Sequence, residues 1–112
     1  MITTHVLDTS IGRPAAGVGV VLESERDTAT WMPVGRGATD GDGRLTHLVP
    51  EGTRLPAGTY RLTFDVAGYF EARRVSSFYP RVEITFVVAA GEPHYHVPLL
   101  LSPFGSSTYR GS

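Results

Sequence analysis

Two segments in which apolar and polar residues alternate constrain the fold of this chain most. In residues 81–88 the apolar positions start at Val82 and recur at every second residue, and residues 59–66 repeat the pattern from Tyr60. Side chains alternate between the two faces of a β-strand, so each segment predicts a strand with one face in a core. The opposite face of each strand would meet solvent or an interface.

Weaker strand patterns and turn residues occupy the rest of the chain. The 13 glycines and 8 prolines among 112 residues interrupt the strand patterns about every ten residues, a spacing typical of sandwiches and barrels. We expect one short helix at residues 67–73. The further strands are expected at 3–8, 17–23, 30–35, 44–48 and 94–101, with turns at 12–14, 40–43, 56–58 and 90–93. The sequence therefore predicts one all-β domain over residues 1–112, a two-sheet β-sandwich of seven or eight strands.

Composition excludes several classes of function. With 10 basic and 11 acidic residues the net charge is -1, so the chain has no positive field with which to bind a nucleic acid. It has no cysteine, which excludes disulfides and thiolate chemistry and fits a reducing compartment. The first residues show neither a basic segment nor a long apolar run, and no stretch is long enough for a membrane helix. We expect a cytoplasmic protein.

A pair of histidines begins the last predicted strand. His94 and His96 flank Tyr95, so both imidazoles would lie on one face, about 7 Å apart along the chain. The pair is compatible with a polar strand end in solvent, with an acid–base pair, or with a zinc site completed by His5. The segment alone leaves these alternatives open.

The segment 40–43, Asp-Gly-Asp-Gly, resembles the start of a calcium loop but does not complete one. The fifth position of that loop would be Arg44, a cation, and the sixth would be Leu45 where a glycine is required. A tight hairpin turn is the better interpretation. Arg44 then stands at the start of the next strand, from which its side chain could point into a site.

Taken together, the motifs resemble the hydrolase branch of the transthyretin-like family. The resemblance rests on HVLD at 5–8 with GRPA at 12–15, on TDGDGR at 39–44, and on HYHVPLLLSP at 94–103 followed by YRGS at 109–112. It covers nearly the whole chain in matching order and spacing. The tetrapeptide YRGS separates this branch from the hormone-carrying transthyretins. Ser106 departs from the branch, which usually has tyrosine there, and we expect an effect on local packing only.

The resemblance implies a fold, a reaction and an assembly. The fold would be a transthyretin-like (prealbumin-like) sandwich. The reaction would be hydrolysis of 5-hydroxyisourate at a cyclic amide bond, giving 2-oxo-4-hydroxy-4-carboxy-5-ureidoimidazoline on the way from urate to allantoin, without metal or cofactor. The assembly would be a homotetramer, a dimer of dimers, with its sites in the channel between dimers and with no nucleic-acid or membrane partner.

The resemblance also implies roles for individual residues. His5 and His96 would be the general base and its hydrogen-bonded partner, in an order that the sequence leaves open. Arg44 would bind substrate and stabilise negative charge, as a guanidinium that keeps its proton can do. Ser112 would orient a histidine or the water, through its hydroxyl or a terminal carboxylate. The residues expected to contact substrate are His5, Arg44, Tyr109 and Arg110.

Two further histidines are expected to be less important for catalysis. His94 would lie behind His96, and His47 would be a surface residue.

Three other functions remain as alternatives. A carrier of an apolar ligand in the same channel would need an aliphatic lining. A zinc hydrolase built on the histidines would need carboxylates to orient them. A purely structural sandwich would leave the final tetrapeptide unexplained.

Overall fold

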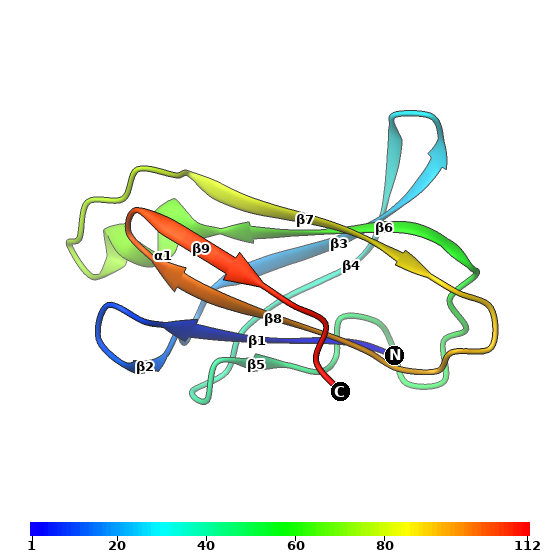
Figure 1. Cartoon of the computed structure of the whole chain (residues 1–112), viewed down its shortest axis with the longest axis horizontal. Helices are drawn as coiled ribbons and strands as arrows, with labels where there is room; N and C mark the ends of the chain where they lie inside the picture. The colour runs from blue at the N-terminus through cyan, green and yellow to red at the C-terminus, as the bar shows by residue number, and fades with distance from the viewer.

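The computed structural model describes residues 1–112 as two β-sheets packed face to face, with one short helix at an end of the sandwich (Figure 1). The elements in chain order are β1 (Ile2–Asp8), β2 (Arg13–Pro14), β3 (Gly19–Asp27), β4 (Thr30–Ala38), β5 (Arg44–Leu45), β6 (Gly58–Asp65), α1 (Val66–Ala72), β7 (Arg81–Val88), β8 (Tyr95–Ser102) and β9 (Gly105–Thr108). The predicted all-β sandwich is confirmed. The helix α1 has seven residues, too few to cross a bilayer.

The first sheet joins the two ends of the chain. Its strand order is β2-β1-β8-β9, with β5 also paired to β1. β1 and β8 run parallel over their whole length, from the Ile2–Tyr95 pair to the Asp8–Leu101 pair. Figure 1 shows β8 (orange) between β1 (blue) and β9 (red). This pairing places residues near the start of the chain beside residues near its end.

The second sheet, β4-β3-β6-β7, contains the two strands that the sequence predicted best. In β6 the side chains of Tyr60, Leu62 and Phe64 are buried, and in β7 the inward side chains start at Val82 as expected. They form one core with the inward side chains of the first sheet, among them Ile2 and Val6. The alternating patterns thus define which face of each strand enters the core.

Several boundaries differ from the sequence expectation. β5 spans two residues instead of five because β2 and β5 pair with the same edge of β1. β5 pairs with Thr4 and His5, and β2 pairs with Leu7 and Asp8. β8 begins at Tyr95, which leaves His94 just before the strand. The short strands β2 and β9 were not predicted, so the sandwich has nine strands. β9 is polar and lies at an edge of its sheet, so its sequence shows no alternation.

The apolar segment 97–101 is explained mainly by the core of the chain itself. Val97, Leu99 and Leu101 are buried between the sheets, and Leu100 is the half-buried member that faces outward. The strand therefore gives less reason for a partner subunit than its composition suggests.

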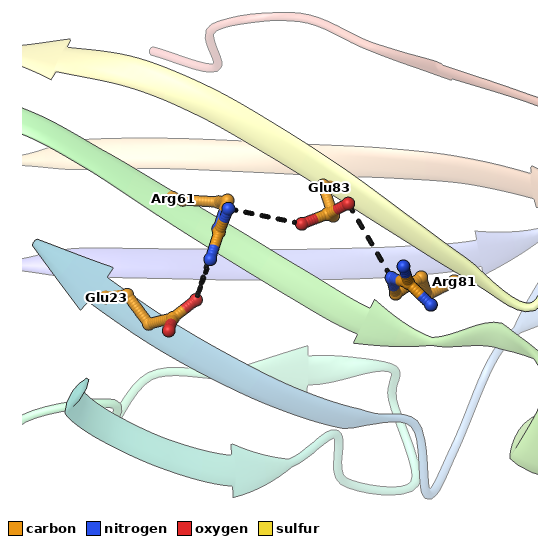
Figure 2. A network of polar contacts seen from close by, with 4 residues as sticks. All are labelled: Glu23, Arg61, Arg81 and Glu83. Carbon is orange, nitrogen blue, oxygen red and sulfur yellow. Dashed lines mark hydrogen bonds and ion pairs between the residues drawn. The ribbon is translucent and has the colours of Figure 1, made fainter. Parts of the chain in front are cut away.

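The outer face of the second sheet carries charges that neutralise one another (Figure 2). Arg61 lies 2.8 Å from the Glu23 carboxylate and 3.4 Å from that of Glu83, which also pairs with Arg81 at 3.6 Å. The Arg61 guanidinium stacks over Trp31 at 4.3 Å from the ring centroid. Arg61 and Arg81 therefore have carboxylate partners within the chain, whereas Arg36 on β4 is exposed and forms no ion pair.

A buried hydrogen bond attaches α1 to the first sheet. The helix is capped by Asp65, whose carboxylate accepts the amide of Gly68 at 3.0 Å. From within the helix, Tyr69 donates its hydroxyl to the Asp8 carboxylate at 2.8 Å, and Asp8 is only 1% exposed. Burial, together with this hydrogen bond, raises the pKa of Tyr69 to about 12.

We expect Tyr69→Phe to lower the free energy of unfolding by about 1–3 kcal/mol, because a buried carboxylate oxygen loses its donor. Urea denaturation followed by circular dichroism measures the change. Tyr79→Phe, at an exposed tyrosine, is the matched control and should stay within about 0.5 kcal/mol of the parent. Equal effects at the two positions would contradict a structural role for the Tyr69 hydrogen bond.

Candidate active site

A pocket of about 380 Å³ opens on the outer face of the first sheet. Because Tyr95 and Val97 direct their side chains into the core, His96 between them points outward into this pocket. The lining includes Thr3, Arg44, His94, His96, Gly111 and Ser112. Three of the four predicted catalytic residues, Arg44, His96 and Ser112, are therefore brought together from distant parts of the chain.

His5, the fourth predicted catalytic residue, lies beside the pocket on the same sheet. Its half-buried side chain projects from the outer face of β1, as does that of Thr3 two residues earlier. It is the direct partner of Arg44 across the antiparallel β1–β5 pair, so the two side chains lie next to each other. Arg44 forms no ion pair, in contrast to the arginines of the second sheet shown in Figure 2.

The Asp40–Gly43 segment places both His5 and Arg44. The Asp40 carboxylate accepts the amides of Asp42 at 2.8 Å and Arg44 at 3.0 Å, and these hydrogen bonds lower the pKa of Asp40. Gly43 has φ +76, and a Cβ there would meet the Val6 carbonyl oxygen at 2.4 Å. The tight turn is confirmed, but it connects β4 of one sheet to β5 of the other and so is not a hairpin.

A hydrogen bond from this turn determines which ring nitrogen of neutral His5 carries the hydrogen. Its Nε2 lies 2.8 Å from the carbonyl oxygen of Asp42. Because a carbonyl oxygen can only accept, Nε2 must carry the hydrogen, and neutral His5 keeps its lone pair on Nδ1. The turn thus determines which nitrogen of His5 remains available.

The surroundings of His96 favour its neutral form. Burial disfavours the imidazolium and lowers the pKa of His96, and the nearby positive charges of Arg44 and His5 lower it further. Nδ1 lies 2.8 Å from the hydroxyl oxygen of Thr3, while Gly111 donates its amide to the His96 carbonyl at 2.8 Å. A neutral imidazole beside a guanidinium can take a proton from water while the guanidinium stabilises negative charge.

Tyr109 and Arg110 lie away from this pocket in the single chain. Tyr109, an exposed residue, lines a separate pocket of about 250 Å³ between the edge strands β7 and β9. Arg110 stacks over the Tyr95 ring at 4.7 Å and lies 3.9 Å from the Glu92 carboxylate. The structure therefore does not bring these two residues together with His96.

The remaining histidines lie at the rim of the site or outside it. His94 is exposed and lines the pocket from the segment before β8. His47 is exposed and follows β5, outside the pocket lining. His5, His94 and His96 do not form a group with metal-ligand geometry, nor do any other three His, Asp or Glu side chains of the chain.

Sequence reasoning missed two residues that touch His96. Thr3 shares an outward face with His5 because it stands two residues earlier on β1, which is a signal that the strand pattern contains. Gly111 belongs to the final segment 109–112 that was expected to line the site, but it was given no role of its own, although a Cβ at this position would meet Cδ2 of His96 at 2.5 Å.

Comparisons with known proteins agree on one family. A family model described as HIUase/Transthyretin family matches residues 2–111. The 5-hydroxyisourate hydrolase of Salmonella typhimurium is 45% identical over 112 residues, which are 100% of this chain and 81% of that protein. The 5-hydroxyisourate hydrolase of Mus musculus is 43% identical, over 99% of this chain and 94% of that one.

Solved structures of the same family resemble the chain over almost its full length. Klebsiella pneumoniae 5-hydroxyisourate hydrolase superposes with a TM-score of 0.85 at 37% identity, covering 99% of this chain and 98% of that chain. Sea bream transthyretin in complex with thyroxine superposes with a TM-score of 0.90 at 31% identity, covering 98% of this chain and 93% of that one.

We predict that Arg44→Ala raises the pKa of His96 part of the way back toward its ordinary value of about 6.5. The rise should be partial, because burial is the larger cause of the depression and remains in the variant. Titration of the imidazole signals by NMR measures this change. Arg36→Ala, which removes an exposed arginine of β4 in the second sheet, should leave the pKa of His96 unchanged. Equal shifts in the two variants would mean that Arg44 does not act on His96 specifically.

Proposed function

The chain belongs to the HIUase/transthyretin family, and we propose that it hydrolyses 5-hydroxyisourate by opening its six-membered ring at a cyclic amide bond. The observation that carries this proposal is the pocket that combines His96, a histidine with lowered pKa, with Arg44, an arginine without an ion-pair partner. Such a lining suits hydrolysis of a polar ring better than transport of an apolar ligand.

In the proposed reaction His96 is the general base. It takes a proton from water as the water oxygen bonds to the amide carbonyl carbon. The negative charge that develops on the carbonyl oxygen is stabilised by the Arg44 guanidinium, which stays protonated. The carbon–nitrogen bond then breaks, the ring nitrogen takes the proton back from His96, and the carbonyl becomes the carboxyl group of 2-oxo-4-hydroxy-4-carboxy-5-ureidoimidazoline. The cycle needs no cofactor.

The other predicted residues have supporting roles in this proposal. His5 lies beside Arg44 on the outer face of the sheet, and in its neutral form it offers the lone pair of Nδ1 to the substrate. Ser112 lines the pocket and orients the water. For Tyr109 and Arg110 to contact substrate, the tail must move or a neighbouring subunit must supply its own tail, since in the single chain both lie elsewhere.

We also propose a homotetramer with its sites at the dimer–dimer interface. β7 and β9 lie at the ends of their sheets, so each has one edge without a partner strand, and such free edges favour pairing with another chain. Exposed apolar side chains lie along this side of the sandwich, with Val87 70% exposed and Tyr109 59% exposed. A cytoplasmic location is proposed as well, on the basis of a cysteine-free composition.

The protein should accelerate the decay of freshly generated 5-hydroxyisourate, measured by ultraviolet absorbance against the spontaneous rate. Exhaustive treatment with a chelator should leave the rate unchanged, because the proposed base and charge-stabilising group are side chains. A decay rate equal to the spontaneous one would disprove the function. Loss of the rate on chelation, with recovery on adding zinc, would favour the metal alternative.

Variants locate that activity in the pocket. His96→Ala, Arg44→Ala and His5→Ala should each lower turnover by about 10² to 10⁴-fold, the range for positioned acid–base and charge-stabilising groups. His47→Ala is the control and should be nearly silent, since His47 is exposed and lies outside the pocket lining. A loss at His47 as large as that at His96 would place the chemistry elsewhere.

Light scattering should give a mass near four times 12.1 kDa, as expected for the proposed homotetramer. Replacing Val87 by lysine, which puts a charge on the exposed edge, should shift the assembly toward smaller species. Thr28→Lys, at the exposed tip between β3 and β4, is the control and should leave the mass unchanged. A monomer at micromolar concentration would refute the assembly and its interface sites.

A further inference from the structure

We propose that Thr3 is a positioning residue whose hydroxyl oxygen accepts the Nδ1 hydrogen of His96, so that the Nε2 lone pair is the one available to the pocket. The inference rests on the proposed function in one respect, since it takes His96 to be the general base. It adds a residue that neither the motifs nor the resemblance singled out.

The strand pairing places Thr3 beside His96. The two residues are direct partners in the parallel β1–β8 pair, and both project from the outer face of the sheet. The Thr3 hydroxyl oxygen lies 2.8 Å from Nδ1 and has no other hydrogen-bond partner within the chain. The contact joins residues 93 positions apart in the sequence and depends on this register.

The imidazole is held from its other side by the tail. The Gly111 amide bonds the His96 carbonyl at 2.8 Å, and the space that a Cβ would need at Gly111 is taken by Cδ2 of the ring, 2.5 Å away. The ring therefore lies between Thr3 and the Gly111 backbone. Nε2 is the ring nitrogen that forms no hydrogen bond within the chain.

The direction of the hydrogen bond follows from the proton cycle. A hydroxyl can donate to a bare Nδ1 or accept from a protonated one. When Nε2 takes the proton of water, the imidazolium carries hydrogens on both nitrogens, and Thr3 can then only accept. An accepting Thr3 fits both the neutral base and the imidazolium. The proton can therefore enter and leave at Nε2 without any rotation of the hydroxyl.

The two histidines are thereby held in opposite tautomers. The Asp42 carbonyl requires a hydrogen on Nε2 of His5, while the Thr3 hydroxyl holds the hydrogen of His96 on Nδ1. Arg44 from β5 and His5 from β1 lower the pKa of His96, and the pocket is also lined by His94 and by Met1, which carries the N-terminal ammonium. A change at Thr3 leaves all four in place, so its effect can be assigned to the lost hydroxyl.

The test compares Thr3→Val, which keeps the shape and removes the acceptor, with Thr3→Ser, which keeps the acceptor. We expect kcat/KM for 5-hydroxyisourate to fall about 10- to 100-fold in Thr3→Val, the size expected from the loss of one hydrogen bond to a group that becomes charged. Thr3→Ser should restore most of the loss. Thr9→Val is the control. It removes a β1-side threonine hydroxyl that donates to the Leu101 carbonyl of β8 at 3.1 Å and does not contact His96, so kcat/KM should stay unchanged.

A second measurement does not depend on turnover. Nitrogen-15 correlation spectra of the unliganded protein, recorded above the pKa of His96, should show the hydrogen on Nδ1 in the parent and in Thr3→Ser. In Thr3→Val the population should shift toward the Nε2–H tautomer. A parent His96 with its hydrogen on Nε2 would overturn the proposal, as would a Thr3→Val variant with unchanged tautomer and unchanged kcat/KM. If the parent failed to hydrolyse 5-hydroxyisourate, the proposed function would be refuted, and the spectra would still show which nitrogen of His96 carries the hydrogen.

Discussion

The parallel pairing of β1 with β8 is the interaction on which the site depends. It connects the two ends of the sequence through a continuous ladder from Ile2–Tyr95 to Asp8–Leu101. The inward side chains of both strands enter the core, which fixes the register, because a shift by one residue would turn every core side chain outward. The same register brings Thr3 opposite His96 on the outer face. The geometry of the proposed general base is therefore stabilised by the packing of core residues that lie outside the pocket.

The two outer faces of the sandwich illustrate how charge separates a structural surface from a candidate site. On the second sheet, Arg61 and Arg81 are paired with Glu23 and Glu83, so their charges are largely neutralised within the chain (Figure 2). On the first sheet, Arg44 has no carboxylate partner and instead depresses the pKa of His96. Arg44 is exposed, so its charge is hydrated and free to bind a group of opposite charge. The lowered pKa of His96 beside an unpaired guanidinium is the physical reason for placing function on the first sheet.

The sequence predicted those features that local patterns determine. Period-two alternation identified β6 and β7 with their inward faces, and the helix at 67–73 was found within one residue as Val66–Ala72. β2, β5 and β9 were missed or mispredicted in length because they are defined by which edge of another strand is free, a property that no short window contains. Likewise, His5, Arg44 and His96 were chosen by resemblance to a family, whereas the contact of Thr3 with His96 follows only from the register of two strands at opposite ends of the chain.

The strand residues of the candidate site are held by more backbone hydrogen bonds than the tail beyond β9, and this difference bears on the roles proposed for them. His96, Thr3 and His5 stand on strands paired along their length, and Arg44 follows a turn fixed by the Asp40 carboxylate. The tail beyond β9 contacts β8 through one backbone bridge, between Gly111 and His96, and through the Arg110 guanidinium over the Tyr95 ring. A proton-transfer group needs a fixed orientation, which paired strands provide. Contacts to substrate tolerate adjustment on binding, so this tail is a suitable place for the substrate contacts proposed for Tyr109 and Arg110, and in the single chain Arg110 rests against Tyr95 and Glu92.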